Sequence, residues 1–321
     1  QWWNLDNTRE EDVEAFFGEG SLNVNDKTKL TVGFRSYDQD TMVDAKDGYF
    51  GVFDGVEKVF NSNDSGVVPK VNIAHNISDD VMVYGTYSEG FRASGINRVR
   101  PAQTAFIPET YDSDYLESLE FGFKSTLADG KLILNGAYFM MDWNDFQSTT
   151  FNLAYSTVAF VDNVGNAEIN GLELDATYKP NDTLTLSGYM VSNDPSLSED
   201  YYDVSGVLQA NSGNRLAYVP ELSYVLGLDK VLSIFGMPGY VSVDYSYTGD
   251  RYTSQANDLK LPSYAIANMR VGVESGNRSM EVFISNLTDE NGYQSRYNDF
   301  GDIRRTQNRP RVIGLRFKYR Y

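Results

Sequence analysis

The sequence predicts an all-β fold, an antiparallel transmembrane β-barrel of about thirteen strands with long outer loops and short periplasmic turns. Three observations lead to this prediction. The last strand alternates strictly between apolar and polar residues, strand-like segments recur along the whole chain, and the connections between them are alternately short and long.

The C-terminal segment has two unlike faces. A period of two indicates a β-strand, and here the aromatics lie on one face and the cations on the other. The first face carries Ile313, Leu315, Phe317, Tyr319 and Tyr321, and the second carries Arg316, Lys318 and Arg320. Such a strand at the edge of a soluble sheet invites aggregation, whereas closure of a barrel removes the edge and lipid covers the apolar face. An edge strand of a soluble sandwich is the alternative.

The N-terminal part is expected to begin as a loop through about Glu14, with a short helical turn around residues 10–15. Strands follow over residues 16–22 and 27–37, where Leu30, Val32 and Phe34 share one face. The acidic stretch from Asp38 to Gly66 is expected to be a long loop.

Eleven further segments complete the predicted barrel. They cover residues 71–77, 81–92, 113–127, 131–147, 158–178, 183–193, 222–229, 241–247, 265–274, 280–284 and 312–321. The segments 81–92 and 131–147 alternate poorly, which periodicity alone does not explain.

The connections form two classes. Short ones fall near residues 23–26, 78–80, 128–130, 179–182, 232–238 and 275–277, and long ones near 38–66, 93–112, 148–156, 194–216, 250–262 and 289–309. Tight turns on one side and long loops on the other are typical of outer-membrane barrels. Bacterial single-chain barrels have even strand numbers, so an odd count predicts that residues 1–321 are the C-terminal portion of a larger barrel.

Composition excludes several classes of function. With Lys+Arg 27 and Asp+Glu 45 the net charge is −18, which argues against nucleic-acid binding. Cysteine is absent and His75 is the lone histidine, so disulfides, thiolate metal sites and histidine clusters are excluded. We therefore expect neither an enzyme nor a resident cofactor. No apolar run approaches the ~18 residues of a spanning helix, and the mean hydropathy is −0.41.

Several motifs resemble those of TonB-dependent outer-membrane receptors, in the order expected for that family. They are Val83-Tyr84-Gly85-Thr86-Tyr87-Ser88-Glu89-Gly90-Phe91-Arg92 leading to Gly95-Ile96-Asn97, then Glu120 to Lys124, Asp142 to Gln147, Asn163 to Glu173, Asn286 to Asp289, and Pro310 to Tyr321 with its terminal aromatic.

The resemblance implies a receptor in the outer membrane of a Gram-negative bacterium. It implies a complete protein with a plug domain inside a barrel of about 22 strands, of which this chain would supply the last thirteen. The plug, the first strands and the energy-coupling box (the TonB box) would lie elsewhere. The implied partners are the TonB–ExbB–ExbD machinery, the plug and remaining strands, lipopolysaccharide and lipid, the barrel-assembly machinery, and a small-molecule or oligosaccharide ligand.

Two sets of residues are candidate functional positions. Basic and amide side chains are expected at the outer mouth, where guanidinium groups suit anionic ligands: Arg92, Asn97, Arg98, Arg100, Arg304 and Arg305. Pairing of these arginines with loop carboxylates is the alternative, and we favour it. Phe317, Tyr319 and Tyr321 resemble the family's barrel-assembly signal, and the same side chains would also contact lipid.

The function implied by the resemblance is active import of a scarce nutrient complex: iron–siderophore, haem, cobalamin or oligosaccharide. A passive porin-like or structural barrel is the first rival, and a soluble β-sandwich or lectin-like binding domain is the second. The loops contain no readable code for the ligand.

Overall fold

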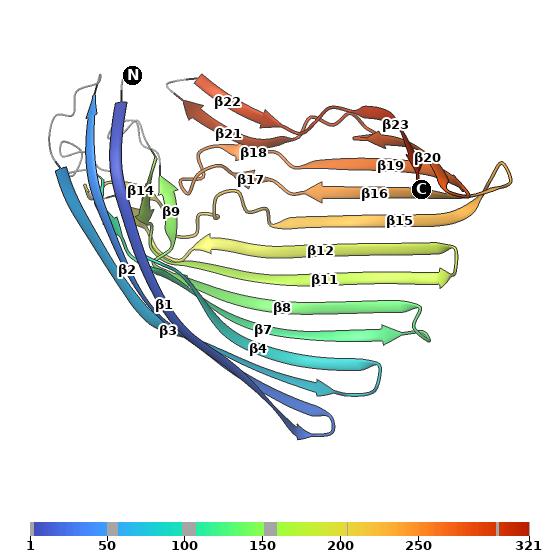
Figure 1. Ribbon diagram of the computed structural model, residues 1–321, viewed down its shortest axis with the longest axis horizontal. Helices are drawn as coiled ribbons and strands as arrows, with labels where there is room; N and C mark the ends of the chain where they lie inside the picture. The colour runs from blue at the N-terminus through green and yellow to red at the C-terminus, as the bar shows by residue number, and fades with distance from the viewer. Residues whose placement is uncertain are drawn as a thin grey trace.

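The computed structural model describes residues 3–49, 57–97, 107–150, 159–203, 205–299 and 302–320. The prediction of thirteen strands is confirmed, because one antiparallel sheet of thirteen strands dominates the structure (Figure 1). In sheet order these strands are β1 (Trp3–Asn25), β2 (Thr28–Tyr49), β3 (Glu57–Asn76), β4 (Val81–Arg92), β7 (Asp114–Leu127), β8 (Leu132–Asn144), β11 (Ala167–Asn181), β12 (Leu184–Leu197), β15 (Leu222–Ile234), β16 (Met237–Thr248), β19 (Tyr264–Ser275), β20 (Arg278–Ser285) and β23 (Val312–Tyr319).

Every strand of the sheet pairs with its sequence neighbours, so the sheet is a curved meander with β1 and β23 at its two edges. Tight turns join the strands at one end, at residues 26–27, 77–80, 128–131, 182–183, 235–236 and 276–277. These lie within or beside the short connections predicted from the sequence. Phe235 and Gly236 both have positive φ, 53° and 79°, as a type I′ hairpin turn requires.

The opposite end of the sheet carries small two-stranded hairpins. They are β5 (Gly95–Ile96) with β6 (Thr110–Tyr111), β9 (Gln147–Thr150) with β10 (Phe160–Asn163), β13 (Tyr201–Tyr202) with β14 (Leu208–Ala210), β17 (Arg251–Tyr252) with β18 (Lys260–Leu261), and β21 (Tyr293–Asp299) with β22 (Asp302–Gln307). Five of the long predicted connections therefore contain local β-structure of their own.

Two expectations for the N-terminal part are wrong. Residues 3–14 form the first half of β1 rather than a loop with a helical turn, and most of the stretch 38–66 belongs to β2 and β3. The ladder between β1 and β2 runs from the turn at 26–27 to the pair Trp3–Tyr49. The long hydrogen-bonded ladder holds these polar segments extended, although their side chains lack the apolar alternation that marks the rest of the sheet. On one face of β2, Tyr37, Gln39, Thr41 and Val43 are buried.

The sheet has one apolar and one polar face. Cross-strand neighbours lie on the same side of a sheet, so the register shows how the apolar positions line up. They include the pairs Val32–Val71, Ile73–Gly85, Tyr87–Leu119, Phe121–Tyr138, Leu172–Tyr138, Leu186–Leu228, Leu226–Tyr245, Val243–Met269, Val271–Val282 and Val282–Leu315.

No second layer of described residues covers the apolar face. Leu315 is 75% exposed and Phe317 is 67% exposed. A soluble sandwich would bury such residues against another sheet, so the alternative of a soluble sandwich is wrong. Among the residues described, no helix is long and apolar enough to cross a membrane.

The two poorly alternating strands have a structural explanation. Tyr84 of β4 and Phe139 of β8 lie on the polar face, each directly opposite a glycine of the neighbouring strand. A Cβ at Gly122 would lie 2.5 Å from Tyr84, and one at Gly171 would lie 2.2 Å from Phe139. The rings thus lie over the glycines, which explains large aromatics on a face that is otherwise polar.

Candidate functional site

The candidate site lies at the end of the sheet that carries the hairpins. We call the described residues of the five connections 93–113, 145–166, 198–221, 249–263 and 286–311 the outer platform. Each connection bonds to the next through side chains that recognise backbone groups. The platform is therefore one network built on the strand ends.

Asp114, the first residue of β7, is the centre of the first junction. Its side chain is 1% exposed and lies opposite Arg92 at the end of β4. The carboxylate accepts hydrogen bonds from Arg92 Nε (2.9 Å), Trp143 Nε1 (3.0 Å) and the Gln147 backbone N–H (2.9 Å). Arg92 Nη2 also contacts the same oxygen. A buried carboxylate with this many donors is fully compensated.

Arg92 itself connects two loops. Its Nη2 donates to the carbonyl of Gln147 at 2.7 Å, and its guanidinium lies 4.9 Å from the ring centroid of Trp143. The Gln147 amide returns the contact by donating to the carbonyls of Ala93 (3.0 Å) and Asp112 (2.8 Å). Arg92 thus pairs with a carboxylate, as the favoured expectation holds, although Asp114 begins a strand rather than standing in a loop, and a role of Arg92 in ligand binding stays a prediction.

Asn97 is 6% exposed and joins the first connection to the second. Its Nδ2 donates to the carbonyl of Val161 at 2.6 Å, and its Oδ1 accepts from the Val161 backbone N–H at 2.8 Å. The side-chain amide of Asn97 thus makes the two hydrogen bonds that a neighbouring strand would make with Val161 of β10. Its role in ligand binding stays a prediction, because both ends of the amide already bond to backbone.

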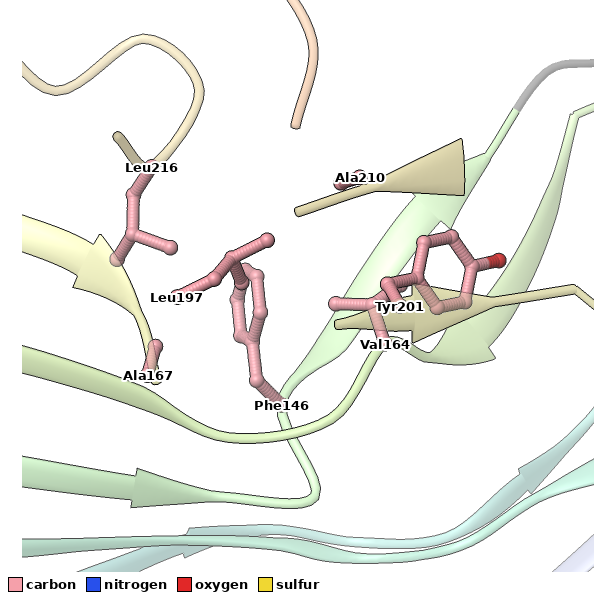
Figure 2. Close-up of a cluster of buried hydrophobic side chains, with 7 residues drawn as sticks. All are labelled: Phe146, Val164, Ala167, Leu197, Tyr201, Ala210 and Leu216. Carbon is pink, nitrogen blue, oxygen red and sulfur yellow. The ribbon is translucent and has the colours of Figure 1, made fainter. Parts of the chain in front are cut away.

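A hydrophobic cluster joins the second and third connections (Figure 2). Phe146 and Val164 come from one loop, and Leu197, Tyr201 and Leu216 come from β12 and the loop that follows. Ala167 and Ala210 complete the cluster, and Trp143 packs against it. Burial raises the pKa of Tyr201, whose hydroxyl donates to Asp162 at 2.8 Å. The same burial raises the pKa of Asp162.

Ion pairs join the third and fourth connections. Arg215 Nη1 lies 2.9 Å from Asp250, and Lys260 Nζ lies 2.9 Å from the same carboxylate oxygen. The hydrogen bond from Lys260, aided by Arg215, holds the pKa of Asp250 below its usual value. Arg251 continues the chain of contacts, because its Nη2 donates to the carbonyl of Tyr293 at 2.9 Å.

The remaining predicted ligand residues lie either outside the described residues or far from Arg92 along the sheet. Arg98 and Arg100 lie outside the described residues. Arg304 and Arg305 lie on β22, between β20 and β23, and seven strands of the sheet separate β20 from β4. Arg305 packs over Tyr293, 5.3 Å from its ring centroid. In the described part of the chain, the structure does not bring the two groups of arginines together.

Sequence reasoning missed Asp114, Gln147, Arg215 and Asp250. Asp114 begins β7 and Gln147 ends the motif Asp142 to Gln147, but no local pattern distinguishes any of the four side chains from a solvated one. Asp114 lies 22 residues from Arg92 in sequence, and Gln147 lies farther still. Only the register of the strands, which sets Arg92 opposite Asp114, could have indicated these contacts.

Comparison with known proteins settles the family. Residues 4–287 match the family described as "TonB dependent receptor-like, beta-barrel". The chain belongs to this TonB-dependent receptor family. It is also 23% identical over 243 residues to the pesticin receptor of Yersinia pestis, a match covering 75% of this chain and 33% of that protein. The predicted resemblance is thus confirmed.

Solved structures show the same fold. The ferric yersiniabactin uptake receptor FyuA from Yersinia pestis superimposes with a TM-score of 0.82 at 16% identity, covering 99% of this chain and 47% of that one. The siderophore receptor PiuA from Acinetobacter baumannii gives 0.78 at 17%, covering 99% and 44%. This TonB-dependent receptor chain spans about a third of its curated relative and less than half of these structures.

Membership in the family assigns the two faces of the sheet. TonB-dependent receptors are outer-membrane proteins of Gram-negative bacteria, which confirms the expected location. In such barrels the apolar band contacts lipid and the polar face lines the interior. The tight turns are accordingly periplasmic, and the outer platform lies at the cell surface.

Proposed function

We propose that this chain is part of a receptor that binds a scarce nutrient complex at the cell surface and imports it with energy from TonB. A metal chelate such as an iron–siderophore complex is the cargo that we favour among the nutrients named above. The support comes from the family and from relatives that are named as siderophore receptors.

The observation that carries the proposal is the outer platform. Loops that recognise a ligand gain affinity when they are ordered before binding. Here the described residues of the five connections are joined by the buried carboxylate of Asp114, the cluster around Phe146, the pairs of Asp250 and the bond from Arg251 to Tyr293. A passive pore has no need of loops ordered in this way. The proposed work is binding and gating, with no covalent step.

The partners belong to the same proposal. A TonB–ExbB–ExbD complex would act through a plug domain, and the wall formed by this chain would surround that plug together with further strands. Phe317 and Tyr319, exposed on the lipid face of β23, would contact lipid and the barrel-assembly machinery. Tyr321 lies outside the described residues, and its part in the assembly signal stays a prediction.

The proposal is tested with the complete receptor in a host lacking its own siderophore receptors. Uptake of radioactive iron supplied as a panel of siderophore complexes is measured with and without TonB. We expect saturable uptake of one class of complex that disappears when TonB is deleted. Uptake that rises linearly with concentration and ignores the loss of TonB would instead support a passive porin-like barrel.

A further inference from the structure

The hairpin of β15 and β16 ends in a segment that stands free of the neighbouring strands. β12 pairs with β15 only as far as Leu184–Lys230, and β19 pairs with β16 only as far as Val273–Gly239. Beyond these pairs, residues 232–238 are paired only within their own hairpin. We call these residues the tip segment, and Figure 1 shows the turn between β15 and β16 reaching past the turn between β11 and β12.

The tip segment is the apolar one among the tight turns. It contains no charged residue, and Ser233 is its only polar side chain. Polar side chains favour turns that lie in water. The other five turns each carry a charged or amide side chain: Asp26 and Lys27, Asp79 and Asp80, Asp129 and Lys131, Asp182, and Asn277. The composition therefore indicates that the tip segment has surroundings of a different kind.

Phe235 stands at the end of the tip segment. Its side chain is 95% exposed, the highest value among the large apolar residues in the described part of the chain. Its φ of 53° is left-handed, a conformation that bulky side chains rarely adopt. Asparagine followed by glycine is the preferred sequence of a type I′ turn. Phenylalanine is thus unfavourable here both for the backbone and for contact with water, so we expect a contact outside this chain to compensate for it.

The lipid face of the sheet continues into the tip segment. Leu228 lies on this face, and the alternation of a strand places Leu232 and Ile234 on it as well. Lys230, between them, directs its charge away from hydrocarbon, because its Nζ donates to Thr183 Oγ1 at 2.7 Å in the turn of the next hairpin. Lysines at the edge of a bilayer reach out of the hydrocarbon in this way. The tip segment is therefore continuous with the surface that contacts lipid.

The length of β16 indicates the depth of the tip segment in the membrane. Tyr247 stacks on Tyr224 on the lipid face at the outer end of the strands, with ring centroids 5.0 Å apart. Belts of aromatic residues mark both interfaces of such barrels. A tilted strand crosses the hydrocarbon core in about 9–11 residues, which is the length of the stretch from Tyr247 back to Met237. Phe235 thus lies at the level of the inner headgroups.

We propose that the tip segment is an anchor in the inner, phospholipid leaflet of the outer membrane. Phe235 and Leu232 insert between the headgroups and the ends of the acyl chains that lie beneath them. This contact compensates for the unfavourable turn and fixes the depth of this part of the wall. The anchor requires only the lipid face that family membership assigns, so it does not depend on the proposed uptake.

The first test measures the depth of position 235 in the complete receptor, reconstituted in vesicles of phosphatidylethanolamine and phosphatidylglycerol. A nitroxide is attached through Phe235→Cys and, in a matched protein, through Asp182→Cys, because residues 1–321 contain no cysteine. Asp182 lies in the polar turn between β11 and β12. We expect oxygen, which concentrates in lipid, to relax the label at position 235 most strongly. A water-soluble nickel chelate should relax the label at position 182 most strongly.

The second test separates anchoring from turn formation by hydrogen exchange in the same vesicles. Phe235→Asn gives the turn the residue that type I′ prefers, so a purely local role predicts slower exchange of the amides of residues 232–237. Anchoring predicts the opposite, an exchange that is roughly tenfold faster. Phe235→Trp keeps an aromatic ring suited to the interface and should exchange like the wild type. Amides of β19 serve as the internal reference and should be unchanged in both variants.

Either of two results would overturn the anchor. The first is a label at position 235 that the nickel chelate reaches as readily as the label at position 182, because the tip segment would then stand in the periplasm, open to a protein partner. The second is exchange in Phe235→Asn that is slower than in the wild type or unchanged. Folding of every variant is verified by heat-modifiable electrophoretic mobility, and the uptake assay described above is independent of both tests.

Discussion

Replacement of Asp114 by asparagine should loosen the outer platform while leaving the barrel wall intact. The change keeps the shape of the side chain but turns one acceptor oxygen into an NH₂ donor. The Oδ2 atom of Asp114 accepts hydrogen bonds from Arg92, Trp143 and the Gln147 backbone N–H. With asparagine in place, either these three donors face an NH₂ group, or the backbone N–H and Nε of Arg92 lose the second oxygen as an acceptor.

The magnitude follows from these contacts. Each buried donor left without an acceptor costs about 1–3 kcal/mol, and breaking a buried ion pair costs about 3–5 kcal/mol. The side chain of Arg92 is 48% exposed, so solvent screens its share. We expect a loss near the lower half of that range, about 3–4 kcal/mol, confined to the connections that meet at Asp114.

Hydrogen exchange on the complete receptor measures this local effect. At 1.4 kcal/mol per tenfold, amides of residues 92–97 and 143–150 should exchange roughly a hundred- to thousand-fold faster. Amides of β15 and β16 should be unchanged. Asp142→Asn is the matched control, because Asp142 is exposed on β8 and makes no hydrogen bond with a described residue. Equal exchange in the two variants would refute the role assigned to Asp114.

Three further predictions follow from the faces and ends of the sheet. Leu226→Arg should destabilise the barrel by about 2–4 kcal/mol in a urea titration in lipid bilayers, whereas Val225→Arg, equally exposed on the interior face, should cost less than about 1 kcal/mol; equal losses would contradict the assignment of the faces. Phe317→Ala with Tyr319→Ala should lower the folded fraction in cells, and a normal yield after refolding into liposomes without assembly factors would assign the defect to assembly rather than to lipid contact. Because Lys260 and Arg215 lower the pKa of Asp250, the stability from this carboxylate is present above its unfolded pKa and is lost as the pH falls through the lower folded value. A protease that is active on both sides of pH 4 should therefore cut residues 249–262 faster below about pH 4, and Asp250→Asn should be cut at a rate that lacks this pH dependence.

The strands of the wall could be predicted because lipid on one side and a polar interior on the other impose a period of two. The period is not strict, however, because Val225 is apolar and lies on the interior face next to Leu226 on the lipid face. Apolar alternation did not predict the outer halves of β1, β2 and β3, which extend beyond the lipid-facing band and carry mostly polar residues. Their pairing depends on the partner strand, which a single segment does not reveal.

The candidate site was harder to predict than the wall. Arg92 was identified from a motif, and its partner Asp114 was not, because a buried carboxylate and a solvated one read alike in sequence. Asn97 is predicted as a ligand residue, and the structure adds that its amide bonds to the backbone of β10, a contact that no sequence pattern indicates.

The rings that lie over glycines have a consequence for how the wall is put together. Such couples recur along the sheet on both of its sides: Phe34–Gly18, Phe121–Gly85, Tyr84–Gly122, Phe123–Gly136, Phe139–Gly171, Tyr240–Gly272 and Phe283–Gly314. A strand that slid by two residues would keep its greasy side toward the bilayer, so hydrophobicity alone tolerates that error. It would, however, set most of these rings against a residue with a side chain, Phe34 being the exception because Gly20 stands two residues from Gly18. These ring–glycine pairs therefore favour the correct register each time a strand pairs with its neighbour.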